Sequence, residues 1–156
     1  MNVQLSERKV CALTGHRKLP ADFDKNALID CLEERILSGT DYFLCGMAQG
    51  FDLLALECLL YLRKKYKFEI EACVPYVGQE LSFEAAERKR YKEFLELCDK
   101  KIVIFDSYRQ GCFLARDRYM VNCADELVAY CKRETGGTAY TVREAKKQKI
   151  PVYFVE

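Results

Sequence analysis

Short apolar runs alternate with longer amphipathic stretches along the whole chain. Six of the runs are continuous in apolar residues, which is typical of strands covered on both faces of a sheet. They occupy residues 9–15, 42–46, 69–75, 101–106, 126–131 and 151–155. Between them, the spacing of apolar residues predicts helices over 22–38, 51–66, 81–98, 113–123 and 138–148. Residues 51–66 are apolar nearly all round, so we expect this helix to be deeply buried.

The strict alternation of strands and helices predicts an α/β fold. Successive β-α-β units give a mostly parallel sheet with right-handed crossovers and helices on both faces. No repeat, linker or low-complexity segment interrupts the pattern, and 156 residues suffice for a sizeable core. We therefore predict a single Rossmann-like three-layer domain over residues 1–156, with a sheet of about six strands.

Charge and hydropathy narrow the class of protein. The chain has 25 Lys and Arg against 24 Asp and Glu, so it has no overall attraction for nucleic acid, which we do not expect as a partner. No apolar run reaches the roughly 20 residues that a membrane helix needs. The opening "MNVQLSERKV" lacks the apolar core of a signal peptide. We expect a cytoplasmic protein with no membrane partner.

The nine cysteines do not predict a metal site. They are never closer than eight positions apart, no C-x-x-C pair occurs, and the chain has one histidine. A structural zinc is therefore not expected, and no cofactor is predicted. Most of the cysteines lie in apolar runs, where they act as small hydrophobic residues. Cys45 and Cys112, beside predicted loops, are the two candidates for a reactive thiol.

The loops after the first five strands carry most of the residues suited to binding a ligand. These loops contain "TGHR", "GMAQGFD", "PYVGQ", "SYRQG" and "ETGGT", and seven of the eight glycines lie in them. Parallel strands point the same way, so all five loops gather at the carboxyl edge of the sheet. Open α/β sheets bind their ligands at that edge, where the strand order reverses.

Two of these loops open helices and could cradle an anion. Gly46 and Gly50 lead into a helix whose first N–H groups suit a phosphate, with a tight strand-to-helix turn as the alternative. Asp52 either caps that helix or sits in its first turn, where the helix dipole favours a carboxylate, or else it binds ribose hydroxyls. The segment "TGGT" at 135–138 makes a second phosphate cradle, unless Thr138 is a plain N-cap.

Arg116 is a basic residue that the pattern places near the crevice. It lies four positions before Met120, so both share one helix face. An arginine there is a natural partner for a phosphate or carboxylate. The alternative is a solvated arginine paired with Asp117 or Glu126.

His16 is the only histidine, and it follows Gly15 at the end of the first strand. No Ser, Cys or carboxylate is placed beside it by the sequence, so a role as general base is not favoured. Because Arg17 follows directly, we interpret the loop as one that contacts a phosphate or base of the ligand. The alternative is a histidine that fixes the structure of its loop.

Taken in order, these motifs resemble the SLOG superfamily of Rossmann-like proteins. The matching string is "TGHR", "GMAQGFD", the proline and "GQ" after the third strand, "RDRYMVN" and "GGTAYTV", over residues 14 to 142. The superfamily includes the LOG-type nucleotide phosphoribohydrolases and the DNA-processing protein DprA. The chain is similar above all to the YpsA-like branch of bacterial proteins.

The resemblance implies a site for a phosphorylated, nucleotide-like ligand. With the loops, it predicts ligand contacts from Thr14, Gly15, His16, Arg17, Gly46, Met47, Ala48, Gly50, Asp52, Pro75, Gln79, Arg116, Met120, Gly136, Gly137 and Thr138.

The resemblance also bears on the reaction. In LOG-type enzymes a glutamate two residues after the threonine joins the arginine in cleaving an N-glycosidic bond. Tyr140 stands at that position here, so an enzyme would combine Arg116 with a carboxylate from Asp52, Glu57 or Glu144.

Three functions follow from the sequence. We expect a protein that binds or senses a nucleotide or a nucleotide-derived molecule such as ADP-ribose. The first alternative is a nucleotide N-glycosidase related to the LOG-type enzymes. The second is a nucleic-acid-binding module like DprA, by analogy of fold only. SLOG proteins are often oligomeric, so the resemblance is also compatible with a homo-oligomer.

Overall fold

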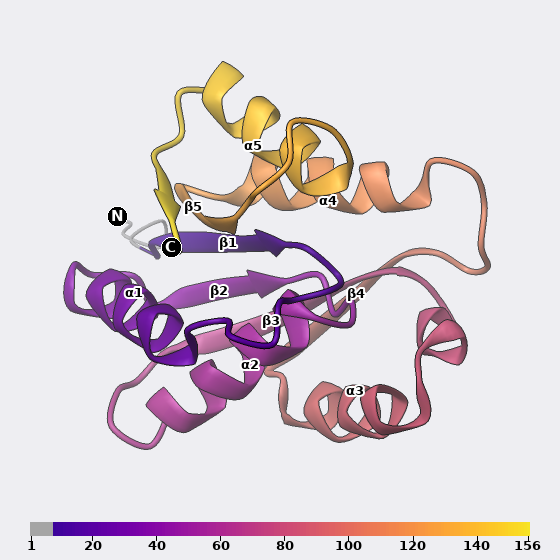
Figure 1. Ribbon diagram of the computed structural model, residues 1–156, viewed down its shortest axis with the longest axis horizontal. Coiled ribbons are helices and arrows are strands. Elements are labelled where there is room, and N and C mark those ends of the chain that lie inside the picture. Colours follow the sequence, from indigo (N-terminus) through magenta and orange to yellow (C-terminus); the bar gives the residue numbers. More distant parts are fainter. Residues whose placement is uncertain (1–7) are drawn as a thin grey trace, which may run out of the picture.

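In the computed structural model, which describes residues 8–156, a six-stranded parallel sheet lies between two layers of helices (Figure 1). The strand order is β4-β3-β2-β1-β5-β6. The strands are β1 Val10–Gly15, β2 Tyr42–Cys45, β3 Glu69–Tyr76, β4 Lys100–Phe105, β5 Glu126–Tyr130 and β6 Val152–Phe154. The inference about a signal peptide concerns residues that lie largely outside the described range.

Three helices cover one face of the sheet and two cover the other (Figure 1). The first layer contains α1 Lys25–Leu37, α2 Phe51–Leu62 and α3 Ala85–Leu97, and the second contains α4 Cys112–Cys123 and α5 Gly137–Lys147. Each layer buries its own apolar cluster against the sheet. The predicted single three-layer α/β domain is therefore confirmed. None of the helices in residues 8–156 combines the length and apolarity needed to cross a membrane.

Helix α2 is the most deeply buried helix, as its composition predicted. Eight of its twelve residues are buried, because it packs against β1 and lies between α1 and α3. Most apolar side chains around this helix are thus covered by the sheet on one side and by α1 and α3 on the others, whereas Tyr61 is exposed.

Helix α1 begins three residues later than the predicted 22–38. The side chain of Asp24 accepts a hydrogen bond of 3.0 Å from the backbone N–H of Ala27, which makes Asp24 the N-cap. The helix therefore begins at Lys25 and ends at Leu37.

The predicted helix over 81–98 is wrong at its start. A short 3-10 helix, η2 Gln79–Ser82, follows a turn at Gly78, whose φ is +92°. Phe83 then adopts an extended backbone, and its ring packs edge-on against Tyr91 at 5.6 Å. Burying Phe83 under α3 interrupts the helical path, so the regular helix begins only at Ala85.

The expectation that all six strands are covered on both faces holds only for the central ones. Strands β1, β2, β3 and β5 are almost wholly buried, whereas β4 and β6 are exposed or half-buried. The two exceptions are the edge strands of the sheet, where the helices cover less of each face. Apolar runs alone do not reveal which strand lies at an edge.

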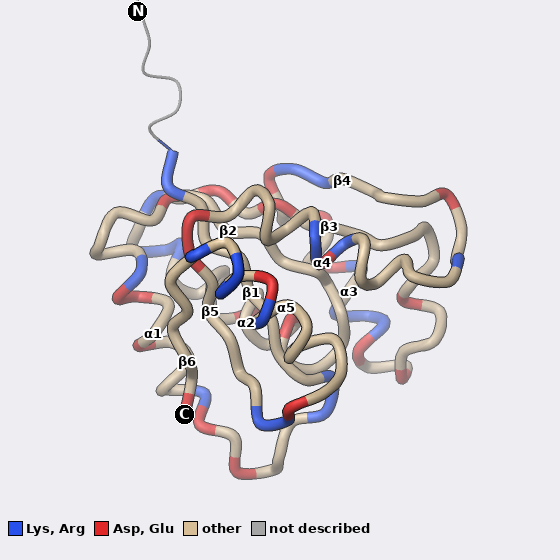
Figure 2. The backbone as a smooth tube through the Cα atoms, turned by 90° about the horizontal axis from the view of Figure 1, so that it is seen from above, with Lys and Arg blue, Asp and Glu red and all other residues tan. Residues whose placement is uncertain are grey.

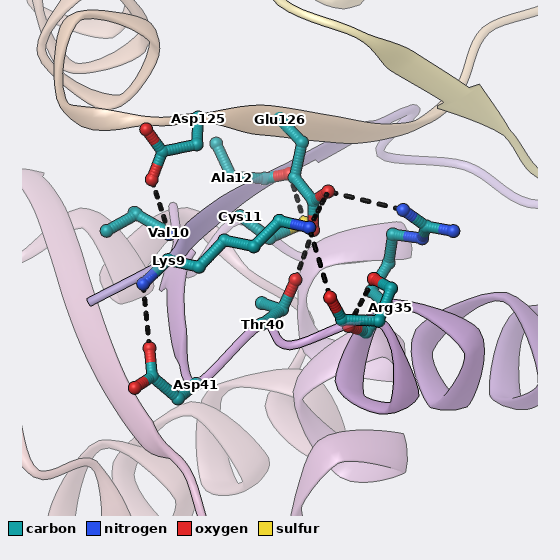
Figure 3. Close-up of polar contacts among 10 residues, drawn as sticks. Lys9, Val10, Cys11, Ala12, Arg35, Thr40, Asp41, Asp125 and Glu126 are labelled. Atoms are coloured by element: carbon teal, nitrogen blue, oxygen red, sulfur yellow. Dashed lines mark hydrogen bonds and ion pairs between the residues drawn. The ribbon is translucent and has the colours of Figure 1, made fainter. Parts of the chain in front are cut away.

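Three aspartates clamp the amino ends of neighbouring strands in the same way. Each aspartate directly precedes a strand, donates its backbone N–H to the carbonyl of a residue at the start of the adjacent strand, and accepts that residue's N–H on its carboxylate. The N–H to carboxylate distances are 2.8 to 2.9 Å. These reciprocal aspartate pairs are Lys9 with Asp41, Val10 with Asp125 and Ile70 with Asp99; Figure 3 shows the first two.

A buried carboxylate joins the same edge to α1. Glu126 is 2% exposed, and it accepts hydrogen bonds from Arg35 Nη1 at 3.2 Å and from the hydroxyl of Thr40 (Figure 3). The ammonium of Lys9 lies 3.7 Å from the same carboxylate. These partners offset the cost of burying the charge. They also show that Glu126 does not pair with Arg116, which was one alternative for that arginine.

Candidate functional site

A cavity lies at the carboxyl edge of the sheet, between the ends of β1 and β5. Strand order reverses there, because β2, β3 and β4 extend from β1 in one direction and β5 lies on its other side. The cavity has a volume of about 620 Å³, within the range of small-molecule sites. The predicted residues that line it are Thr14, Gly15, His16, Arg17, Ala48, Asp52, Arg116, Met120, Gly136, Gly137 and Thr138.

Five of the predicted residues lie outside the cavity lining: Gly46, Met47, Gly50, Pro75 and Gln79. Met47 has a left-handed backbone with φ 63°, which is unusual for a residue other than glycine. The buried amide of Gln79 donates to the Met47 carbonyl at 3.3 Å and so supports this loop. Gln79 is thus placed to hold the loop behind the cavity.

Two glycines of the first loops are required by close packing. A Cβ on Gly15 would lie 2.2 Å from the ring of Phe51, and one on Gly50 would lie 2.2 Å from the carbonyl oxygen of Arg17. Gly50 also has a φ of +83°, which disfavours any side chain. These glycines allow two segments of the chain to pack closely together. At Gly50 this corresponds to the predicted alternative of a tight strand-to-helix turn.

The glycines at the start of α5 face open space instead. A Cβ on Gly136 would meet no atom within 4 Å, and one on Gly137 would meet only Asp117 Oδ2, at 3.8 Å. Gly136 is the N-cap and has no side chain to cap the helix, so the first N–H groups stay available to a ligand. Thr138 lies inside the first turn, so the alternative of Thr138 as N-cap is wrong.

Arg116 is buried beside the cavity, which rules out a solvated side chain. Its Nε donates to Asp117 Oδ1 at 2.7 Å, and its Nη1 donates to the Gly46 carbonyl at 2.5 Å. A Cβ on Gly46 would lie 2.7 Å from Arg116 Nη1 and 2.9 Å from Asp52 Oδ2. The absence of a side chain at Gly46 therefore lets Arg116 and Asp52 face each other.

Asp52 is a buried carboxylate poised to change charge near neutral pH. It is not the N-cap of α2, a position held by Gly50; its Oδ2 accepts from the Ala48 N–H at 3.2 Å. Burial raises the pKa of Asp52 to about 6, although the charge of Arg116 and the Ala48 N–H act in the opposite direction. A carboxyl group with such a pKa can hold or release a proton at physiological pH.

His16 ties two loops of the cavity together. Its Nε2 accepts a hydrogen bond of 2.8 Å from the backbone N–H of Lys132, and its carbonyl accepts from the N–H of Phe51 at 3.0 Å. Burial lowers the pKa of His16, and the nearby charge of Arg133 lowers it further. The ring is therefore neutral with its proton on Nδ1, the one nitrogen left to donate to a ligand. His16 fixes its loop, as the alternative proposed, and also lines the cavity.

The cavity carries more positive than negative charge. Arg17, Lys18, Arg116 and Arg133 line it, against the carboxylates of Asp52 and Asp117. Thr135, part of the predicted cradle 135–138, also lines the cavity. The sequence did not single out the following lining residues: Leu13, Lys18, Phe113, Leu114, Asp117 as a site residue, and Arg133. Lys18 and Arg133 directly flank the quoted loops, so their position was the available signal.

The other carboxylates considered for catalysis lie elsewhere. Glu57 bonds to Lys25 at 2.5 Å and to Arg90, and Glu144 lies 3.4 Å from Lys147. Neither carboxylate lines the cavity. The hydroxyl of Tyr140 accepts a hydrogen bond from Arg118 on α4, at 3.1 Å. Of the three candidates, only Asp52 is placed to act beside Arg116.

Neither of the two candidate reactive cysteines is placed to act as a nucleophile. Cys45 and Cys112 are both fully buried, and burial raises the pKa of the Cys45 thiol well above its ordinary value. Within residues 8–156, no group of three or more His, Cys, Asp or Glu side chains is arranged to hold a metal ion. The chemistry available in the cavity comes from arginine, lysine, histidine, carboxylate, threonine hydroxyl and backbone N–H groups.

A parallel sheet between two layers of helices, with a cavity where the strand order reverses, defines a Rossmann-like ligand-binding fold. The chain belongs to the YspA SLOG family, whose YpsA model matches residues 16–155. It is 26% identical over 155 residues to UPF0398 protein BH1768 from Halalkalibacterium halodurans, covering 90% of this chain and 82% of that protein. The predicted membership of the SLOG superfamily is confirmed.

Solved structures share the fold at low sequence identity. DNA processing protein A from Helicobacter pylori, described for its single-stranded DNA binding, is 20% identical with a TM-score of 0.68. The match covers 94% of this chain and 64% of that protein, so the chain spans less than two thirds of its length. The molybdenum cofactor carrier protein from Chlamydomonas reinhardtii is 22% identical with a TM-score of 0.58, covering 94% and 76%. These likenesses concern the fold alone.

Proposed function

We propose that the protein binds a phosphorylated nucleotide or nucleotide-derived molecule in the cavity between β1 and β5. The observation that carries the proposal is the open Gly136–Gly137 turn at the uncapped N-terminus of α5. A helix N-terminus offers oriented N–H groups and a partial positive charge, and glycines let a phosphate approach the backbone closely. The phosphate is therefore assigned to this end of the cavity.

The charges around the turn support an anionic ligand. Arg17, Lys18 and Arg133 are exposed cations that line the same cavity. Their charged groups are therefore accessible to a phosphate. Arg116 is held by Asp117 and Gly46, and this fixed position suits orientation of a ligand. A sensing or carrier role needs only these binding contacts.

Calorimetric titration and thermal shift with AMP, NAD, ADP-ribose and inorganic phosphate test the proposal. A ligand that binds only the folded protein raises its melting temperature by mass action. Arg133→Ala removes one exposed cation of the cavity and is expected to weaken binding about five-fold. Arg8→Ala, at the opposite edge of the sheet, is the matched control and should leave affinity unchanged. Absence of binding by all four compounds would refute the proposal.

An enzymatic function is the second candidate, because two carboxylates flank Arg116. Asp117 Oδ1 lies 2.7 Å from Arg116 Nε, and on the other side of the guanidinium burial raises the pKa of Asp52 to about 6. Cleavage of a glycosidic bond uses a pair of carboxyl groups, one of them an acid with a raised pKa. Incubation with purine and pyrimidine nucleoside monophosphates, followed by chromatography for free base, tests this. Release that persists in Asp52→Asn would exclude Asp52 as the acid.

A nucleic-acid partner remains a proposal by analogy with DprA. The near-zero net charge does not by itself exclude it, since a structural relative is described for binding single-stranded DNA. Figure 2 shows basic and acidic positions interspersed over the backbone, which favours a small ligand over a strand tracked by a basic groove. A gel shift with a single-stranded oligonucleotide in 200 mM salt decides between them.

A further inference from the structure

Three aromatic rings from separate segments meet next to the cavity. Tyr76 ends β3, Tyr108 lies in the loop after β4, and Phe113 lies in the first turn of α4. The ring centroids are 5.4 Å apart for Tyr76 and Tyr108, 6.0 Å for Tyr76 and Phe113, and 6.4 Å for Tyr108 and Phe113. We call this group the aromatic shelf.

The aromatic shelf is continuous with the cavity wall. Phe113 belongs to both, because its ring contacts the other two and also lines the cavity. The guanidinium of Arg17 lies 4.5 Å from the centre of the Phe113 ring, and that of Arg116 lies 6.0 Å from it. Planar cations and aromatic faces are therefore layered at one end of the site.

One member of the shelf is left open to solvent. Tyr108 is 61% exposed, although tyrosine rings usually bury most of their apolar surface. Its neighbours hold it edge-on, with an interplanar angle of 85° to Tyr76. A ring held by its neighbours but open on one side presents a surface on which a flat group can stack.

We propose that the aromatic shelf receives the base of the nucleotide whose phosphate lies at the N-terminus of α5. This inference rests on the proposed function and adds to it the orientation and chemical class of the ligand. Gly137 and Phe113 line the same 620 Å³ cavity, so one ligand can contact both ends. Stacking uses the face of a base, so the shelf accepts different bases and selects nucleotides over sugar phosphates.

Titration calorimetry with AMP and with ribose 5-phosphate measures the contribution of the base. The wild-type protein is expected to bind AMP roughly ten-fold more tightly, the size of effect that one base–aromatic stack gives. Tyr108→Ala should lower the affinity for AMP to near that for ribose 5-phosphate and leave the latter unchanged. Tyr108→Phe keeps the ring and should keep the preference. Tyr61→Ala, which removes a tyrosine that is 59% exposed on α2, is the matched control and should have no effect.

The outcomes separate this inference from the proposed function. If AMP and ribose 5-phosphate bind equally well, or if Tyr108→Ala leaves the preference intact, the shelf does not hold the base and only the inference fails. If neither compound binds, the inference fails, and the proposed function fails with it only when NAD, ADP-ribose and inorganic phosphate do not bind either. If a ten-residue oligothymidylate binds more tightly than AMP in 200 mM salt and Tyr108→Ala abolishes that binding, the shelf serves a nucleic-acid strand and the inference is overturned.

Discussion

Gly15→Ala and Gly137→Ala are expected to have different effects, because Gly15 is packed against a buried ring and Gly137 has open space beside it. Both changes add one methyl group, and neither glycine has the positive φ that would strain an alanine. The surroundings differ: the new Cβ would lie 2.2 Å from the ring of Phe51 at Gly15, and 3.8 Å from the nearest atom at Gly137.

The cost of Gly15→Ala follows from how firmly Phe51 is held. Phe51 is fully buried, its ring stacks on Tyr130 with an interplanar angle of 13°, and it packs edge-on against Phe23. A ring so enclosed cannot move by the ångström or more that the new methyl group needs. Overpacking of this kind costs about 1–3 kcal/mol, which lowers the melting temperature by roughly 3–10 °C for a domain of this size. Gly137→Ala should stay within about 0.5 kcal/mol of wild type.

Urea unfolding of both variants measures the change in the free energy of unfolding. A double-mutant cycle with Phe51 tests whether the clash with that ring causes the cost of Gly15→Ala. In a Phe51→Leu background the smaller side chain leaves room for the methyl group, so Gly15→Ala should cost less than it does alone. Gly137→Ala is then titrated with AMP, where the methyl group at the phosphate turn should weaken binding although stability is kept.

Two results would contradict this reasoning. A Gly15→Ala variant within about 0.5 kcal/mol of wild type would mean that the β1 loop and α2 can separate cheaply. A Gly137→Ala variant with unchanged stability and unchanged AMP affinity would mean that no phosphate approaches the turn.

Three further predictions concern buried ionisable groups. Asp52→Asn should stabilise the protein by about 2–3 kcal/mol at pH 7.5. Because the pKa of Asp52 rises from 3.8 to about 6 on folding, the folded state binds the proton more tightly than the unfolded chain, and the wild-type protein loses stability as the pH rises through 6. In urea unfolding, the difference in stability between the variant and wild type should shrink toward pH 4. The pKa of His16 is lowered, so the stability of wild type relative to His16→Asn should fall as the pH drops below 6.5; a pH-independent difference would contradict this. Glu126→Gln removes the carboxylate that pairs with Arg35, which is 13% exposed, so it should cost about 3 kcal/mol in chemical denaturation, and a cost below about 1 kcal/mol would show that the pair is not needed.

The fold could be predicted because its main signals are local. Continuous apolar runs mark the strands, and their alternation with amphipathic stretches fixes the parallel sheet and its two helical layers. Details that depend on single contacts were not visible. The cap at Asp24 and the buried ring of Phe83 each shorten a helix, and both depend on which partner a side chain finds.

The candidate site could be predicted by region but not by role. Topology brings the loops after β1 and β5 together, so Arg17 and Gly137 were expected on one edge of the sheet. The sequence does not reveal which way each residue of a loop points. Gln79 therefore turned out to support the loop of Met47, whereas Phe113 and Arg133 entered the cavity lining without having been expected.

The reciprocal aspartate pairs stabilise the sheet at the amino ends of its strands, whereas the cavity lies at the carboxyl ends. They fix the starts of five strands through backbone groups and carboxylates that lie far from the ligand cavity. Strand register is thereby secured at the amino ends of the strands, so open loop positions at the carboxyl ends, such as Gly136, can change without shifting the sheet, unlike the packed Gly15 and Gly50. A designer could exchange the segment 132–137, or the residues around Tyr108, to vary the cavity and its surroundings on the same frame.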